Sequence, residues 1–171
     1  IALSGGREGQ IGRLLSLNKD EEAREILKIN QDLFDDRFYL EIQRTGRTGE
    51  ESFIQKALNL SDKFDCPLVA TNDVRFISQK EFEAHEARVC IHDSRLLNDP
   101  RRERQYSEEQ YLRSASEMID LFKDIPEAID NTLEIAKRCN LQISLGDNYL
   151  PDYPIPDGLS ADDFLTKQAI K

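Results

Sequence analysis

The run Cys66-Pro67-Leu68-Val69-Ala70-Thr71 decides the fold, because none of its residues is charged in a chain that is 33% charged. Such a run is typical of a strand that is buried on both faces of a parallel sheet. Two further segments have strand character. Arg37 to Gln43 (RFYLEIQ) combines aromatic and branched residues, and Ile1 to Leu3 is a short apolar run closed by glycines. The sequence therefore predicts three strands before residue 72.

Helical patterns separate these strands. Apolar residues recur at helical spacing around residues 11–15, 23–34 and 53–64, and again after residue 81. The residue types that begin helices predict three starts: Asn18 or Asp20 as a cap, and Thr48 with Glu51 and Ser78 with Glu81 as capping boxes. The resulting order of strands and helices predicts an α/β fold with parallel strands and helical crossovers.

Periodicity alone leaves two α/β architectures open, half of a barrel or an open doubly wound sheet. A nucleotide site finds no support, because the chain contains neither a GxGxxG fingerprint nor a Walker loop. The segment Ser4 to Gly9 (SGGREG) resembles a phosphate loop only loosely, since its glycine spacing matches neither signature.

Composition excludes several function classes. The net charge of −10 over 171 residues argues against a broad nucleic-acid-binding face, which needs cations to displace counterions from phosphates. Cys66, Cys90 and Cys139 form no CxxC pair, so we expect reduced, mostly buried thiols rather than a disulfide framework or a zinc site. No apolar run is long enough for a membrane span, and Ile1 to Ser4 lack the basic residues that begin a signal peptide, so we expect a cytoplasmic location.

The second half of the chain has a different pattern. Residues 92–105 (HDSRLLNDPRRERQ) are polar and predict a connecting loop. Ser107 with Gln110 predicts the start of a helix that carries Tyr111 to Phe122, and Asp124-Ile125-Pro126 predicts the start of a second helix that ends near Asn140. These two helices would form a hairpin.

The C-terminal segment predicts a linker and one more helix. Residues 150–158 are too rich in proline for a helix or a central strand, and Ser160 is the expected cap of a helix from Ala161 to Lys171. We therefore expect three parts: residues 1–93 as the α/β part, residues 94–149 as a loop with the helical hairpin, and residues 150–171 as a linker leading into a further domain.

Candidate chemistry is concentrated at the end of the last predicted strand. Residues two apart on a strand point the same way, so Asp73 and Arg75 would share one side at the edge where α/β folds place their sites. Asp73 is then a candidate metal ligand or base, unless the two residues simply form an ion pair or turn the chain. His85 fits a half-buried position beside Phe82, and His92 next to Asp93 is unspecific.

A set of motifs resembles those of the bacterial DNA polymerase III alpha subunits, over essentially the whole chain. They are Leu3 to Gly6, Phe38 to Ile42, Pro67 to Phe76 (PLVATNDVRF), Ala84 to Glu86, Asn98 to Pro100, Asn131 to Ala136, Cys139-Asn140 and Leu150-Pro151 with Pro154. The resemblance is to the second half of the polymerase and histidinol phosphatase (PHP) domain and the segment leading towards the palm. It implies part of a distorted α/β barrel followed by a helical segment, within a longer protein.

In this family the strand ends of the PHP barrel hold up to three metal ions. The family's Asp-x-His pattern corresponds to Asp73-Val74-Arg75, and its Ser-Gly-Cys pattern corresponds to Ser4-Gly5-Gly6. Arg75 and Gly6 thus stand where a histidine and a thiolate would be, and Asp73 alone remains. Because a guanidinium cannot ligate a metal, we expect Arg75 to replace the lost positive charge and no metal to bind this segment.

The resemblance also implies a function. We expect a fragment of a replicative DNA-directed DNA polymerase in which the PHP portion is a non-catalytic scaffold, with Mg²⁺ bound by palm carboxylates beyond Lys171. The implied partners are a proofreading exonuclease subunit, other holoenzyme subunits, and DNA through other domains, but no membrane. The segment Arg44 to Arg47 is the candidate exposed docking loop. The alternatives are a metal-dependent phosphoesterase or 3′–5′ exonuclease at the PHP site, and a helical interaction module over residues 107–139.

Overall fold

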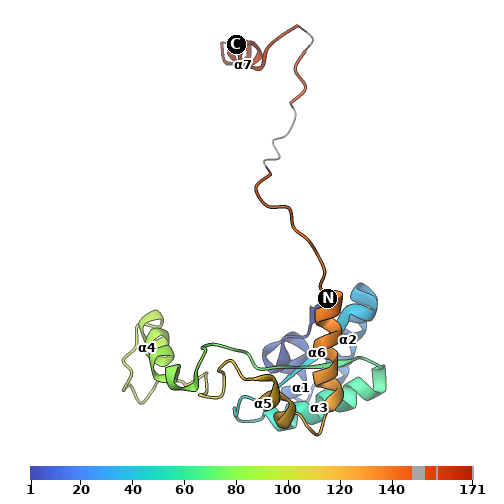
Figure 1. Cartoon of the computed structure of the whole chain (residues 1–171), viewed down its shortest axis with the longest axis vertical. Coiled ribbons are helices and arrows are strands. Elements are labelled where there is room, and N and C mark those ends of the chain that lie inside the picture. The colour runs from blue at the N-terminus through green and yellow to red at the C-terminus, as the bar shows by residue number, and fades with distance from the viewer. Residues whose placement is uncertain (148–152, 157, 171) are drawn as a thin grey trace. The chain divides into compact units, whose positions relative to one another are not determined.

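The computed structural model describes residues 1–147, 153–156 and 158–170. They form two compact units, Ile1–Asn140 and Leu141–Lys171 (Figure 1). The candidate site lies wholly in the first unit. Each unit is described by itself.

A small parallel sheet organises the first unit. Its strands are β1 (Ala2–Leu3), β2 (Phe38–Gln43) and β3 (Leu68–Thr71), in the spatial order β1-β2-β3. Ala2 pairs with Phe38 and Leu40 pairs with Leu68, both in parallel register. The three predicted strands and the α/β class with parallel strands are therefore confirmed.

Helices alternate with these strands. They are α1 (Gln10–Ser16), α2 (Asp20–Phe34), α3 (Glu50–Phe64) and α4 (Phe82–His92), followed by α5 (Ala115–Leu121) and α6 (Pro126–Arg138). Single 3₁₀ turns precede α1, β2 and α4, at Gly6–Glu8, Asp35–Arg37 and Gln79–Glu81.

The two faces of the sheet differ in chemistry, because successive strand residues point to opposite sides. Phe38, Leu40 and Ile42 of β2 belong to the buried apolar core, which also holds side chains from α1, α2, α3 and α6. On the other face, Gln43 donates a hydrogen bond to Glu41 at 2.9 Å, and Thr71 also bonds to Glu41. Polar side chains thus line this face up to the point where the strands end.

Two predicted helix caps are wrong, although both helices begin close to the expected residues. α3 begins after Gly49, which adopts a left-handed φ of 86°, and not at a Thr48–Glu51 capping box. The Glu50 side chain turns inward there and accepts a hydrogen bond from the Thr45 amide in the preceding loop. The helix therefore begins at the left-handed Gly49 without a side-chain cap. α2 follows Lys19, and no side-chain hydrogen bond caps it, because Asn18 is itself left-handed at φ 59°. The Ser78–Glu81 capping box is confirmed.

The predicted helix start at Ser107 is also wrong. Residues 107–113 run past the sheet end instead, and Tyr111 forms an isolated parallel bridge with Phe76. Gln110 is fully buried there, and its side chain donates a long-range hydrogen bond to Asp73. α5 starts at Ala115, after a capping box of Ser114 and Glu117. α6 begins at Pro126, as predicted, and ends at Arg138.

In the second unit, α7 (Ala161–Ala169) follows the predicted cap Ser160, whose hydroxyl accepts a hydrogen bond from the Asp163 amide at 3.1 Å. Part of the predicted linker, Leu150 to Asp152, lies outside the described residues. The domain boundaries after residues 93 and 149 stay predictions. No helix within the described ranges is long and apolar enough to cross a membrane.

Candidate functional site

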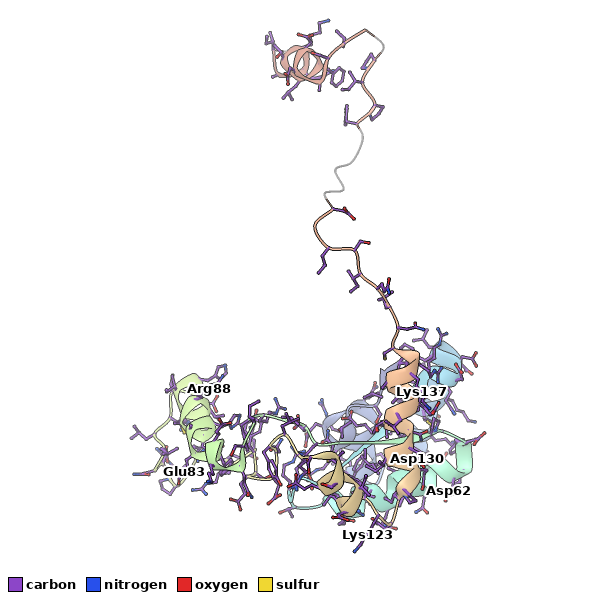
Figure 2. The ribbon with its side chains drawn as sticks, viewed as in Figure 1. Asp62, Glu83, Arg88, Lys123, Asp130 and Lys137 are labelled. Atoms are coloured by element: carbon purple, nitrogen blue, oxygen red, sulfur yellow. The ribbon has the colours of Figure 1, made fainter. Side chains whose placement is uncertain are left out.

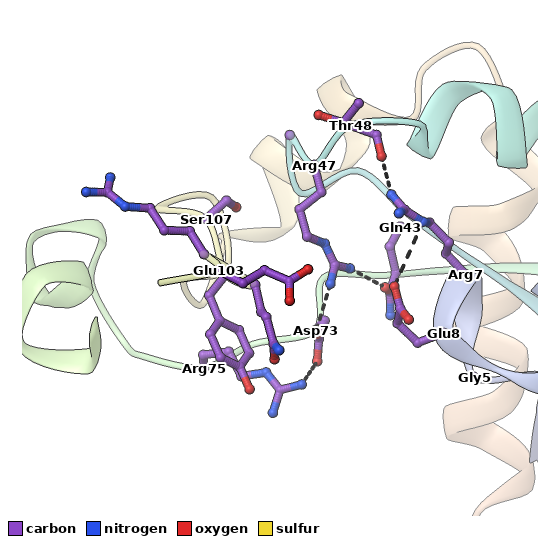
Figure 3. Close-up of a pocket in the computed structure, with 14 residues that line it drawn as sticks. Gly5, Arg7, Glu8, Gln43, Arg47, Thr48, Asp73, Arg75, Glu103 and Ser107 are labelled. Carbon is purple, nitrogen blue, oxygen red and sulfur yellow. Dashed lines mark hydrogen bonds and ion pairs between the residues drawn. The ribbon is translucent and has the colours of Figure 1, made fainter. Parts of the chain in front are cut away.

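An open cavity of about 870 Å³ lies where the three strands end, and polar side chains line it (Figure 3). It collects residues from four separate parts of the chain. They are Gly5, Arg7 and Glu8 after β1, Gln43 at the end of β2 with Gly46 to Thr48 after it, Asp73 and Arg75 after β3, and the returning segment Glu103 to Ser107. Polar residues at the C-terminal ends of parallel strands are the usual location of a site in an α/β fold. The cavity is therefore the candidate functional site.

Asp73 lies two residues beyond β3 and is surrounded by donors. Its Oδ1 atom is 2.8 Å from Arg75 Nη2, and its Oδ2 atom is 4.0 Å from Arg47 Nη1 (Figure 3). Gln110 Nε2 donates a further hydrogen bond to Oδ2 at 2.8 Å. The structure thus brings Asp73 and Arg75 together, although the strand spacing does not explain it, because Asp73 has a left-handed φ of 44°.

Arg47 reaches Asp73 from a loop that its neighbours hold in place. Glu50 is buried, accepts a hydrogen bond from the Thr45 amide at 2.8 Å, and pairs with Arg47 Nε at 3.2 Å. Gln43 Oε1 accepts a hydrogen bond from Arg47 Nη2 at 3.3 Å. Sequence reasoning missed Gln43, Glu50 and Gln110, whose types carry no local signal for a site.

The prediction of an exposed docking loop from Arg44 to Arg47 is wrong. Thr45 is fully buried, and Arg44 forms paired hydrogen bonds to Asp124 at 2.6 and 2.8 Å. Arg44 also bonds to Glu51 at 2.8 Å. The hydrogen bond from Arg44 holds the pKa of Asp124 below its usual range. Through Arg44 the loop is held against the turn between α5 and α6. Both of its arginines are therefore already paired with carboxylates, Arg44 with Asp124 and Arg47 with Glu50.

Gly6 lies beside the Gln43 side chain in a left-handed conformation, with a φ of 57°. A Cβ atom at this position would lie 3.1 Å from the Gln43 side chain. Gln43 in turn donates hydrogen bonds to Glu41 at 2.9 Å and to Thr71 at 3.1 Å. A side chain at position 6 would therefore have to displace a fixed neighbour and adopt a strained backbone conformation.

Arg75 also stacks on Tyr106, with its guanidinium carbon 5.1 Å from the ring centroid. Tyr106 packs edge-on against His85 at 4.8 Å, and His85 contacts Phe76 at 5.5 Å. Burial lowers the pKa of His85, as expected for a half-buried position among aromatic rings. The other histidine, His92, is exposed and bonds only to Asp93 within the described residues.

The donor set of the cavity does not fit a metal ion. In the part of the chain that the structure describes, no three His, Cys, Asp or Glu side chains converge on one point. Two guanidinium groups flank Asp73, the carboxylate that the sequence singled out as a candidate metal ligand. Guanidinium groups cannot ligate a cation and repel it.

The three cysteine thiols do not offer a metal site either. Cys66 and Cys90 are buried and Cys139 is exposed, and all three are free. Burial raises the pKa of Cys66 to about 11, which keeps it a protonated core residue at neutral pH.

Comparison with known proteins finds close relatives. The chain is 53% identical over 167 residues to "DNA polymerase III subunit alpha" of Pseudomonas fluorescens, and 52% identical over 165 residues to the protein of that name from Pseudomonas aeruginosa. It is 50% identical over 169 residues to that of Escherichia coli K12. These matches cover 98%, 96% and 99% of the chain, whereas the chain spans only 14% of each relative. No family model matches.

Proposed function

The chain belongs to the family of DNA polymerase III alpha subunits, and from this membership we propose that it is a non-catalytic scaffold within a replicative DNA polymerase. The single observation that supports a non-catalytic role is the ion pair between Asp73 Oδ1 and Arg75 Nη2, at 2.8 Å. An ion pair at this position replaces a metal's charge with a fixed guanidinium, which supplies no Lewis acid and no activated water.

The proposed fold is part of a PHP-type barrel. Its support is the parallel order of β1, β2 and β3, together with the polar face formed by Glu41, Gln43 and Thr71. That face would line the inside of the barrel, and the cavity around Asp73 would be its mouth. Arg47 and Arg75 would then supply the positive charge beside Asp73 at this mouth without a metal ion.

Nucleotidyl transfer is assigned to other parts of the polypeptide. We place the Mg²⁺-binding carboxylates in a palm outside residues 1–171, because the described carboxylates nowhere form a cluster that could hold two ions. The net charge of −10 supports this division of labour, since a segment so acidic repels the DNA backbone. A cytoplasmic location follows from the same proposal.

We predict that a full-length alpha subunit containing this segment, purified without chelators, has less than about one-tenth equivalent of zinc or manganese per chain at this barrel mouth, because Arg75 and Arg47 repel a cation. Elemental analysis of the wild type and of Asp73→Ala measures it, and the two should agree.

Stoichiometric metal that disappears in Asp73→Ala would contradict this proposal. So would a manganese-dependent phosphodiesterase or 3′–5′ exonuclease activity that the same substitution abolishes. That result would establish the alternative function, hydrolysis at the PHP site. Polymerase activity serves as the control, because Asp73 is not assigned to nucleotidyl transfer and the variant should keep it.

We also propose that this scaffold carries the docking surface for a proofreading exonuclease subunit and supports the other holoenzyme subunits. Cross-linking mass spectrometry of the complex between the full-length alpha subunit and the exonuclease subunit should then yield cross-links to lysines of this segment. Lys28 and Lys137 are exposed reporters on two separate helices. Cross-links confined to peptides outside residues 1–171 would contradict the docking role and favour a surface elsewhere in the polypeptide.

A further inference from the structure

The helix α4 belongs to an arm, residues 76–106, that extends away from the sheet (Figures 1 and 2). Glu83 and Arg88 mark its helix in Figure 2. In most α/β folds the helix after a strand packs back onto the sheet. Here α4 packs mainly on the 3₁₀ turn Gln79–Glu81 and on the returning strand-like segment. We propose that the tip of this arm docks into an apolar groove edged by carboxylates on another domain of the same polypeptide.

The arm is ordered before it meets any partner. Glu86 and Arg102 form an ion pair at 2.5 Å in which both side chains are buried. Cys90 is buried beside them, and the Arg95 amide donates a hydrogen bond to the Cys90 carbonyl at 2.9 Å. At the base, Phe76 and Phe82 pack at 6.0 Å. A preformed arm binds a partner without the ordering cost that a flexible loop would have.

The tip of the arm, defined as Ile91, Leu96 and Leu97, is apolar and exposed. Leu96 keeps 77% of its surface accessible to solvent, and the other two side chains are also classed as exposed. Isolated exposed leucines are ordinary, but three apolar side chains within seven residues at the end of a projecting arm form a patch. Aliphatic side chains at the end of a rigid projection are the kind of anchor that fills an apolar groove.

The surroundings of the tip indicate the charge of the groove. Three exposed arginines, Arg88, Arg95 and Arg101, form its rim. Arg88 has no ion pair among the described residues, whereas Arg95 and Arg101 share one carboxylate, that of Asp99, at 3.8 and 3.2 Å. Residues 76–106 hold five arginines, one lysine and six acidic residues, so the arm is neutral in a chain of net charge −10. The rim thus holds three guanidinium groups that pair with one carboxylate between them, and Arg88, unpaired within the described ranges, is available to a carboxylate of a partner.

The length of the relatives favours a partner on the same polypeptide. The chain spans 14% of each relative, so most of each relative lies outside the matched segment. A covalently attached domain meets the arm at millimolar effective concentration, far above that of a separate protein. This inference uses family membership alone and does not depend on the scaffold role proposed above.

The test uses a full-length alpha subunit that contains this segment, with p-benzoylphenylalanine in place of Leu96. We expect photocross-links within one polypeptide, from position 96 to a peptide outside residues 1–171. Their yield should exceed by roughly ten-fold that from the same label at Leu33 of α2, because a docked groove stays in contact with the tip. Leu33 is a matched control, since it is 69% exposed and lies on a different helix.

A second measurement needs no substitution at the tip. In the unlabelled full-length subunit, phenylglyoxal should modify Arg88, Arg95 and Arg101 several-fold more slowly than the exposed Arg37, which lies outside the arm. Equal yields at positions 96 and 33 together with unprotected rim arginines would overturn the proposal. Cross-links that form only to a second copy, or only when the exonuclease subunit is added, would overturn it as well.

Discussion

Truncation of Phe122 to alanine is expected to lower the free energy of unfolding of the first unit by about 3–5 kcal/mol, as large-to-small core changes do. Phe122 is fully buried at the end of α5, within the core that the sheet shares with α1, α2, α3 and α6. The Arg44 guanidinium stacks on its ring at 5.1 Å. Urea denaturation followed by circular dichroism measures the change.

The matched control is Ile119→Ala, one turn earlier on the same helix. Ile119 is 54% exposed, so its truncation should cost less than about 1 kcal/mol. Equal costs for the two variants would mean that the α5–α6 hairpin does not pack on the sheet. A separate transition for the hairpin in the Phe122→Ala protein would have the same meaning. It would support a boundary near residue 93 instead of one cooperative unit.

The strands were predictable because their signal is local. An uncharged run such as Cys66 to Thr71 can be buried on both faces, whichever elements cover it. The helix caps were less predictable. A Ser or Thr three residues before a Glu or Gln matches the capping-box pattern, but the same side chains can form other hydrogen bonds instead. At Thr48 no capping box forms, because Glu51 accepts a hydrogen bond from Arg44 and Glu50 turns inward to the Thr45 amide.

The failure at Ser107 has a long-range cause. Gln110 does accept a hydrogen bond from the Ser107 amide, at 3.0 Å, as a capping pair would. Its Nε2 atom, however, donates to Asp73, which lies 37 residues earlier. The backbone amide of Arg75 also donates to the Gln110 carbonyl at 2.8 Å. These contacts hold residues 107–113 alongside the sheet end, and nothing within that segment encodes them.

Only the part of the site that is formed by residues close in sequence was predictable. Asp73 and Arg75 are close in sequence, so their spacing and type indicated an ion pair. Arg47 and Gln43 reach the same cavity from β2, across a distance that only the parallel register fixes. The supposedly exposed loop from Arg44 to Arg47 was misjudged because Asp124, its main partner, lies 80 residues further along the chain.

The buried Glu50 is the second residue whose loss should have a large effect. Glu50→Ala is expected to destabilise the first unit by about 3 kcal/mol, because it leaves the buried Thr45 amide without an acceptor and Arg47 without its carboxylate. Glu50→Gln keeps one acceptor oxygen and should cost about half as much. Thermal or urea denaturation of both variants against the wild type gives the two values.

Glu21→Ala is the matched control, because both glutamates lie in the first turn of a fifteen-residue helix. Any loss of interaction with the helix dipole is therefore common to the two variants. The Glu21 side chain is 76% exposed and pairs only with Arg24 among the described residues, so its removal should cost less than about 1 kcal/mol. If Glu50→Ala cost no more than Glu21→Ala, Glu50 would not be what holds Arg47 in place. The cavity around Asp73 would then lack the fixed second guanidinium on which the proposal of a metal-free site rests.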